Sequence, residues 1–142
     1  MKLKYEDLII VFSECELSNC TPRNRMAFRW VFENIDDERN FSPRYFSSNY
    51  AETQKTDCLG YALSMFDKED QAIARLAFLS KGKQNLYKKL GTHTAIGSLT
   101  IDEGLSNDSS INPDTFGHFS FFEFSDTDLS KKFTVSKQIT PN

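Results

Sequence analysis

Hydrophobic segments long enough to cross a membrane are missing from this chain of 142 residues. Its longest apolar run, residues 8–12 (LIIVF), falls far short of the roughly 18 to 20 residues that a spanning helix requires. The run follows a charged start, MKLKYED, and no small-residue cleavage site comes after it. The sequence therefore predicts neither a signal peptide nor a membrane as partner.

Cysteine and clustered positive charge are also scarce. Three cysteines cannot all pair with one another, and with no sign of export the simplest expectation is a reduced, cytoplasmic protein. The net charge is −3, and the basic residues are scattered, with only short pairs such as Lys88–Lys89. This distribution argues against nucleic acid as a partner.

What the chain does contain is typical of one globular domain spanning residues 1–142. A chain of this length buries about two-thirds of its unfolded surface, but it is too short for two enzymatic domains. Hydrophobic residues make up 39% and charged residues 26% of the sequence, which is ordinary globular usage. Phe occurs 13 times and Trp once, so the core is expected to contain aromatic as well as aliphatic side chains.

The hydrophobic patterning predicts an α+β fold with a mostly antiparallel central sheet of about five strands and two or three helices. The expected strands cover residues 25–33, 61–66, 92–101, 117–124 and 131–139. The expected helices cover residues 68–80 and 84–90, and residues 4–12 have helical spacing with a strand as the alternative. Residues 102–116 are rich in turn-forming residues and are expected to be irregular.

Two local patterns add detail to this prediction. In residues 25–33 (RMAFRWVFE), the side chains alternate with period two, which places Met26, Phe28, Trp30 and Phe32 on an apolar face and Arg29 opposite. Asp67 and Asp70 resemble a capping box, so Asp67 is the expected N-cap of the helix.

Cys58 raises the hypothesis of a nucleophile. DCLGY, around Cys58, resembles the DCSGF that opens the catalytic helix of papain-like bacterial cell-wall endopeptidases, and GHFSFFEF resembles the strand that begins with the catalytic His of that family, here His118. The resemblance implies a Cys/His hydrolase, whose thiolate needs a helix N-terminus. A cap at Asp67 instead places Cys58 before a strand, as part of the scaffold.

No metal site is predicted. The candidate ligands are Cys15, Cys20, Cys58, His93 and His118, but the only local pair is CELSNC and the second half of a finger-like spacing is absent.

A third hypothesis uses polar residues on successive strands. FRW at 28–30, the FSPRYF loop and YALSMFDKEDQAIARL resemble parts of small ADP-ribosyltransferase-like, NAD-degrading toxin domains, over about residues 25–80. The resemblance implies that Arg29, Ser64 and Glu123 are catalytic and converge on NAD, with Arg29 and Ser64 binding it. Arg29 would pair with phosphate or ribose. Glu123 would hydrogen-bond the ribose as the glycosidic bond breaks.

Some positions depart from this family. The toxin helix carries a functional Glu where this chain has Ala74 or Arg75, and no E-x-E pair surrounds Glu123. The alternative is a non-catalytic interaction module of bacterial origin, of an immunity, antitoxin or regulatory type. It would bind a protein partner through the long polar loop 34–56, whose aromatic residues are Phe41, Tyr45, Phe46 and Tyr50.

Overall fold

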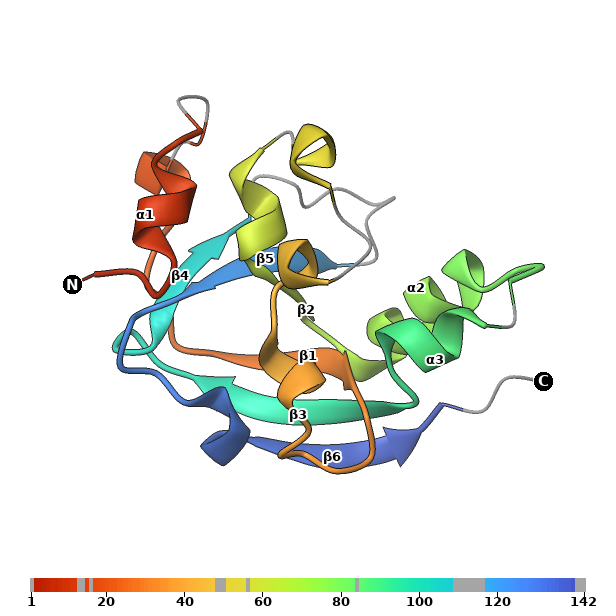
Figure 1. The fold of residues 1–142 in the computed structure, drawn as a ribbon. Helices are drawn as coiled ribbons and strands as arrows, with labels where there is room; N and C mark the ends of the chain where they lie inside the picture. The colour runs from red at the N-terminus through yellow and green to blue at the C-terminus, as the bar shows by residue number, and fades with distance from the viewer. Residues whose placement is uncertain are drawn as a thin grey trace.

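The computed structural model describes residues 2–12, 15, 17–47, 51–55, 57–83, 85–108 and 117–139. In these ranges the chain forms one six-stranded sheet in which every neighbouring pair of strands is antiparallel (Figure 1). The strand order is β4-β5-β2-β1-β3-β6. The strands are β1 (Arg25–Val31), β2 (Leu63–Phe66), β3 (His93–Leu99), β4 (Gly104–Asn107), β5 (His118–Glu123) and β6 (Phe133–Gln138). The predicted α+β class is confirmed.

β4 is the strand that the sequence did not predict. Its four residues, GLSN, lie in the segment expected to be irregular and have weak strand propensity. They become a strand because each pairs with a residue of β5, from Gly104 opposite Glu123 to Asn107 opposite Ser120. Pairing with a distant segment thus overrides local preference.

The α-helices are α1 (Glu6–Ile9), α2 (Glu69–Leu79) and α3 (Leu86–Leu90). None of the helices in the described ranges is long and apolar enough to cross a membrane. α2 lies where the sequence predicts it, but its N-cap is Lys68 and the expectation of Asp67 is wrong. The Asp67 carboxylate is instead bound by the Arg25 guanidinium, so it is not available to cap the helix.

The predicted alternation along β1 is present, but the more deeply buried face is the opposite one. Ala27 and Val31 are fully buried, whereas Met26 on the apolar face is 48% exposed. On this face Ala27 and Val31 share one core cluster with Phe119 and Phe121 of β5. This main core consists of Ala27, Val31, Leu63, Met65, Ala95, Leu99, Phe119, Phe121, Leu129 and Phe133.

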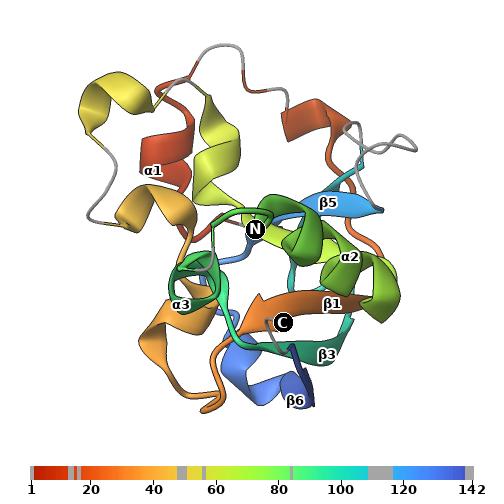
Figure 2. The same cartoon turned by 90° about the vertical axis from the view of Figure 1, so that its right-hand side faces the viewer.

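The other face of the sheet carries two separate groups of elements. α2 and α3 pack over Trp30 of β1 through Leu76 and Tyr87. The N-terminal segment with α1 and the 3-10 helix η5 (Cys58–Tyr61) packs over Phe122 of β5. Figure 2 shows α1 and η5 apart from α2 and α3, so the sheet between the two groups is not covered by a helix of either.

The hydrogen-bonded pairing between the two central strands, β1 and β2, is incomplete. β1 pairs with β3 at every residue from Arg25 to Val31, but it pairs with β2 only at Phe28 opposite Phe66. Past this point β1 and β2 no longer form a ladder.

Candidate binding groove

A groove of about 1000 Å³ crosses the sheet where β1 and β2 part. Trp30, Ser64, Phe66 and His118 contribute to its lining from three adjacent strands. One wall comes from α2 and α3 with Arg75, Leu79, Leu86, Lys89 and Leu90. The other comes from η5, from the 3-10 helix η3 (Arg44–Phe46) and from the residues before it, with Ser42, Pro43, Arg44, Phe46 and Leu59. Pockets of this size commonly bind cofactors or substrates.

Arg29 fills the gap between β1 and β2. Its Nη1 donates to the carbonyl oxygen of Ser64 at 2.8 Å, and its Nε donates to the carbonyl oxygen of Asn40 at 2.9 Å. Burial lowers the pKa of Arg29 to about 10, although the charge of Glu123 acts in the opposite direction. Arg29 therefore remains charged at neutral pH, yet the hydrogen bonds of its guanidinium to Ser64 and Asn40 go to neutral carbonyls.

Positive charge gathers around the groove although the whole chain is acidic. Its lining includes Arg29, Arg39, Arg44, Arg75 and Lys89, and among the described residues no carboxylate lines it. Arg39 is paired with Asp37 at 2.7 Å, but Arg29, Arg44 and Lys89 form no ion pair with a described carboxylate. Such a concentration of unbalanced charge attracts anions.

Aromatic rings provide the apolar part of the lining. Trp30, Phe32, Phe46 and Phe66 all contribute to it. The Trp30 indole is held in place, because its Nε1 donates to the carbonyl oxygen of Ala72 at 2.7 Å and its ring packs against Phe66 at 5.2 Å between centroids. Flat rings beside cationic groups suit a ligand that contains both heteroaromatic rings and phosphate.

His118 begins β5 in the lining of the groove. Its half-buried ring packs edge-on against Phe66 at 5.5 Å between centroids. Burial and the positive charges of Arg75, Arg44 and Arg29 lower the pKa of His118 to about 4. The imidazole is therefore neutral at pH 7, and three cations from three different elements act on it.

This pKa predicts a pH-dependent stability. Between pH 6.5 and pH 4 the unfolded chain binds a proton at His118 that the folded chain does not, so the free energy of unfolding falls as the pH is lowered through this window. We expect His118→Gln to remove about 2 kcal/mol of the difference in stability between pH 7 and pH 4.5. Urea unfolding at the two pH values measures it.

The matched control for that experiment is His93→Gln, which removes the other histidine of the chain and lies outside the groove lining. A pH dependence of stability that is the same in wild type and His118→Gln would contradict the prediction. A loss of equal size in both variants would contradict the assignment to His118.

Glu123 does not join Arg29 and Ser64 in the groove. It lies at the far end of β5 from His118, is absent from the groove lining and forms an ion pair with Lys4 at 2.7 Å between Oε2 and Nζ. Burial raises the pKa of Glu123, and Lys4 opposes this shift. The strand registers also place Ser64 beside Ser120, on the face opposite Glu123. Of the three residues predicted from the sequence, Arg29 and Ser64 both line the groove and meet through the Ser64 backbone carbonyl oxygen.

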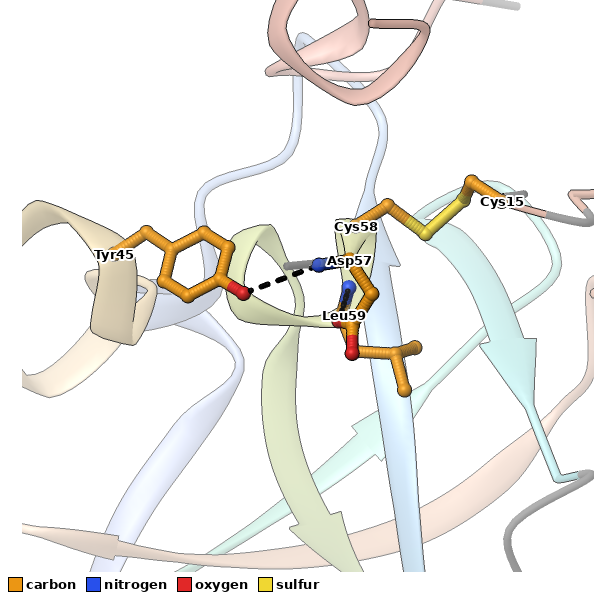
Figure 3. The surroundings of a disulfide bond; sticks show 5 residues. All are labelled: Cys15, Tyr45, Asp57, Cys58 and Leu59. Atoms are coloured by element: carbon orange, nitrogen blue, oxygen red, sulfur yellow. Dashed lines mark hydrogen bonds between the residues drawn. A yellow bond between two sulfur atoms is a disulfide. The ribbon is translucent and has the colours of Figure 1, made fainter. Parts of the chain in front are cut away.

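The hypothesis of a Cys58 nucleophile is wrong, because the sulfur of Cys58 forms a disulfide bond with Cys15 (Figure 3). The expectation that the cysteines are reduced is therefore also wrong for this pair. Cys58 begins η5, where the Asp57 carboxylate accepts from the backbone N–H of Leu59 at 2.8 Å. The disulfide bond ties the N-terminal segment to η5, and η5 contributes Leu59 to the groove wall.

The other sequence-based candidates fall outside the groove or are only partly accessible. In loop 34–56, Tyr45 is 4% exposed and packs in the core, so it is not available to a partner as the interaction hypothesis requires. Phe46 is 46% exposed and lines the groove. Tyr50 lies outside the described residues. His93 Nδ1 lies 2.9 Å from Thr92 Oγ1. Within the described ranges, no group of three or more His, Cys, Asp or Glu could hold a metal ion.

Sequence reasoning missed Arg44 and assigned no function to Arg75. The two residues lie far apart in the chain and reach one groove only because η3 and α2 flank the same part of the sheet. The one signal in the sequence was that Arg75 is a basic residue near the position where the toxin domains of the resemblance carry an acidic residue.

No protein-family model, curated protein or solved structure matches the chain.

Proposed function

We propose that this protein binds NAD in the groove, as an ADP-ribosyltransferase-like domain. The observation that carries the proposal is the groove lining, which combines five cationic side chains and four aromatic rings and contains no described carboxylate. The diphosphate of NAD needs cationic partners, and its two heteroaromatic rings favour stacking surfaces. The positions of Arg29 and Ser64 in this lining support the proposal, because the resemblance assigns NAD binding to these two residues.

Ser64 has the position expected of a residue beside the ligand. Its side chain is exposed on the groove side of β2, while its carbonyl oxygen accepts from Arg29. A small hydroxyl there leaves room for a ribose. We infer that this ribose belongs to the nicotinamide end, as the resemblance implies.

The test is calorimetric titration of the protein with NAD, with release of nicotinamide followed in the same samples. We expect wild type to bind NAD and Ser64→Phe to weaken binding at least ten-fold, because a bulky ring would occupy the space of the ribose. Ser130→Phe, an exchange near η7 (Leu129–Lys131) and away from the groove lining, is the matched control. Absence of NAD binding by wild type at millimolar concentration would refute the proposal.

Glu123→Gln separates binding from catalysis. The resemblance assigns the catalytic carboxylate to Glu123, but this residue does not line the groove, so we expect the variant to keep the NAD affinity of wild type. If NAD is cleaved, loss of nicotinamide release in Glu123→Gln would identify it as the carboxylate of the reaction.

The alternative proposal is a non-catalytic interaction module that uses loop 34–56. Among the loop aromatics that the structure describes, Phe46 is exposed and Tyr45 is buried. Phe46 also lines the groove, so the groove proposal accounts for it equally well. The cytoplasmic location also stays a prediction. Disulfide bonds are more typical of oxidising compartments, so alkylation of the cysteines in intact cells tests this location.

A further inference from the structure

We propose that Arg44 and Arg75, on opposite walls of the groove, form a clamp for the diphosphate of a nucleotide-type ligand, and that Arg29 serves mainly to position the strands beneath it. The inference rests on the proposed function only for its choice of NAD as the ligand. The class of ligand, a compound with adjacent phosphate groups, follows from the positive charge of the lining together with the placement of two guanidinium groups on facing walls.

Arg29 already forms hydrogen bonds within the protein. Two of its guanidinium nitrogens are committed to the carbonyl oxygens of Ser64 and Asn40, which lie on different elements. The bond to Ser64 spans the gap between β1 and β2, and the bond to Asn40 ties the guanidinium to the 3-10 helix Glu38–Phe41. A guanidinium has five N–H donors, so Arg29 can still share in binding a ligand, and further donors come from the walls of the groove.

Arg44 and Arg75 are placed to supply those donors. Arg44 is exposed at the start of η3, where its guanidinium lies over the Tyr45 ring at 5.5 Å, and it forms no ion pair with a described carboxylate. Arg75 is half-buried in α2, with its guanidinium 5.4 Å from the centre of the Phe78 ring. Each side chain is thus flanked by a ring of its own element, and both line the groove.

His118 shares the groove lining with both arginines. Its imidazole lies in the groove lining, and both Arg75 and Arg44 act on it electrostatically, as does Arg29. Like charges brought together from separate elements repel one another, which is unfavourable unless an anion separates them. Guanidinium groups hold phosphate oxygens through paired hydrogen bonds, and two of them on facing walls match two adjacent phosphates.

The experiment compares wild type, Arg44→Gln, Arg75→Gln and Lys88→Gln by calorimetric titration with NAD, with inorganic pyrophosphate and with adenosine. Lys88→Gln is the control, because it removes one positive charge from α3 but lies outside the groove lining. Arg44→Lys and Arg75→Lys keep the charge and lose the paired geometry. Circular dichroism and melting temperature establish that each variant is folded.

We expect Arg44→Gln and Arg75→Gln each to weaken binding of NAD and of pyrophosphate about ten-fold or more, with Lys88→Gln unchanged. Adenosine, which carries no phosphate, should bind all folded variants alike. The affinity for NAD should fall as salt is raised, and it should fall less steeply in the two Gln variants.

The remaining outcomes separate this inference from the proposed function. If NAD binds all four proteins equally, the clamp is wrong and NAD binding stands. If pyrophosphate binds in a manner that depends on Arg44 and Arg75 but NAD does not bind, the clamp stands and the proposed function is wrong. If wild type binds neither compound, the clamp is wrong.

Discussion

Removing the disulfide bond between Cys15 and Cys58 should lower the free energy of unfolding by about 4 kcal/mol. The bond closes a loop with a sequence separation of 43 residues, and a cross-link of that span removes much conformational freedom from the unfolded chain. For a domain of this size the loss corresponds to a fall in melting temperature of about 10 °C or more. Urea unfolding of wild type and of the double variant Cys15→Ala/Cys58→Ala measures it.

Two controls separate the cross-link from the packing of the thiols. Cys20→Ala removes the third cysteine, which is buried in the same cluster but is free, and so leaves the disulfide intact. Unfolding of wild type in the presence of dithiothreitol removes the bond without changing any side chain volume. A double variant that is as stable as Cys20→Ala would contradict the prediction.

The disulfide also bears on the groove. Tyr5 and Phe12 of the N-terminal segment pack against Phe46 and Tyr61, so this segment supports η3 and η5 from behind. Both 3-10 helices are too short to be stable alone and depend on such contacts. We therefore expect reduction to weaken NAD binding as well as stability, because it loosens the wall that contains Arg44 and Leu59.

Replacing Arg29 by Met should cost about 3 kcal/mol of the free energy of unfolding. The change keeps much of the aliphatic volume but removes two charge-assisted hydrogen bonds, and it leaves the carbonyl oxygens of Ser64 and Asn40 without this donor. Since the bond to Ser64 spans the gap between β1 and β2, its loss affects the place where these two strands are least paired. Chemical unfolding of Arg29→Met and Arg29→Lys measures the effect, with an intermediate loss expected for Lys.

Arg39→Met is the matched control, because Arg39 also lines the groove but is solvent-exposed and paired with Asp37 on the surface. Exposed ion pairs contribute little to stability, so the control should lose much less than Arg29→Met. Equal losses in the two variants would show that Arg29 does not hold the two strands together.

Much of the fold could be predicted from local patterns. Residues 25–33 alternate with period two and form β1, and the helical spacing after Asp67 corresponds to α2. Five of the six strands lie in predicted segments, since each carries its own apolar pattern. β4 could not be predicted in this way, because it is a strand only by virtue of its pairing with β5.

The site could be predicted only in part. Arg29 contacts the Ser64 carbonyl oxygen because β1 and β2 are neighbours in the sheet, and their NAD-binding roles stay a prediction. Glu123 occupies the expected strand, but it is five residues beyond His118, at the end where Lys4 binds it. A strand advances about 3.3 Å per residue, so position along β5 decides whether a side chain reaches the groove, and chain order alone does not contain that information.

By itself the sequence determined the α+β class and the position of most elements, because these depend on periodicity and on order along the chain. Only the tertiary structure decided that Cys58 is cross-linked to Cys15, that Asp67 binds Arg25 and that Arg44 and Arg75 face one groove. Each of these contacts joins segments far apart in the sequence. Their formation depends on how the sheet brings those segments together, and no local pattern specifies it.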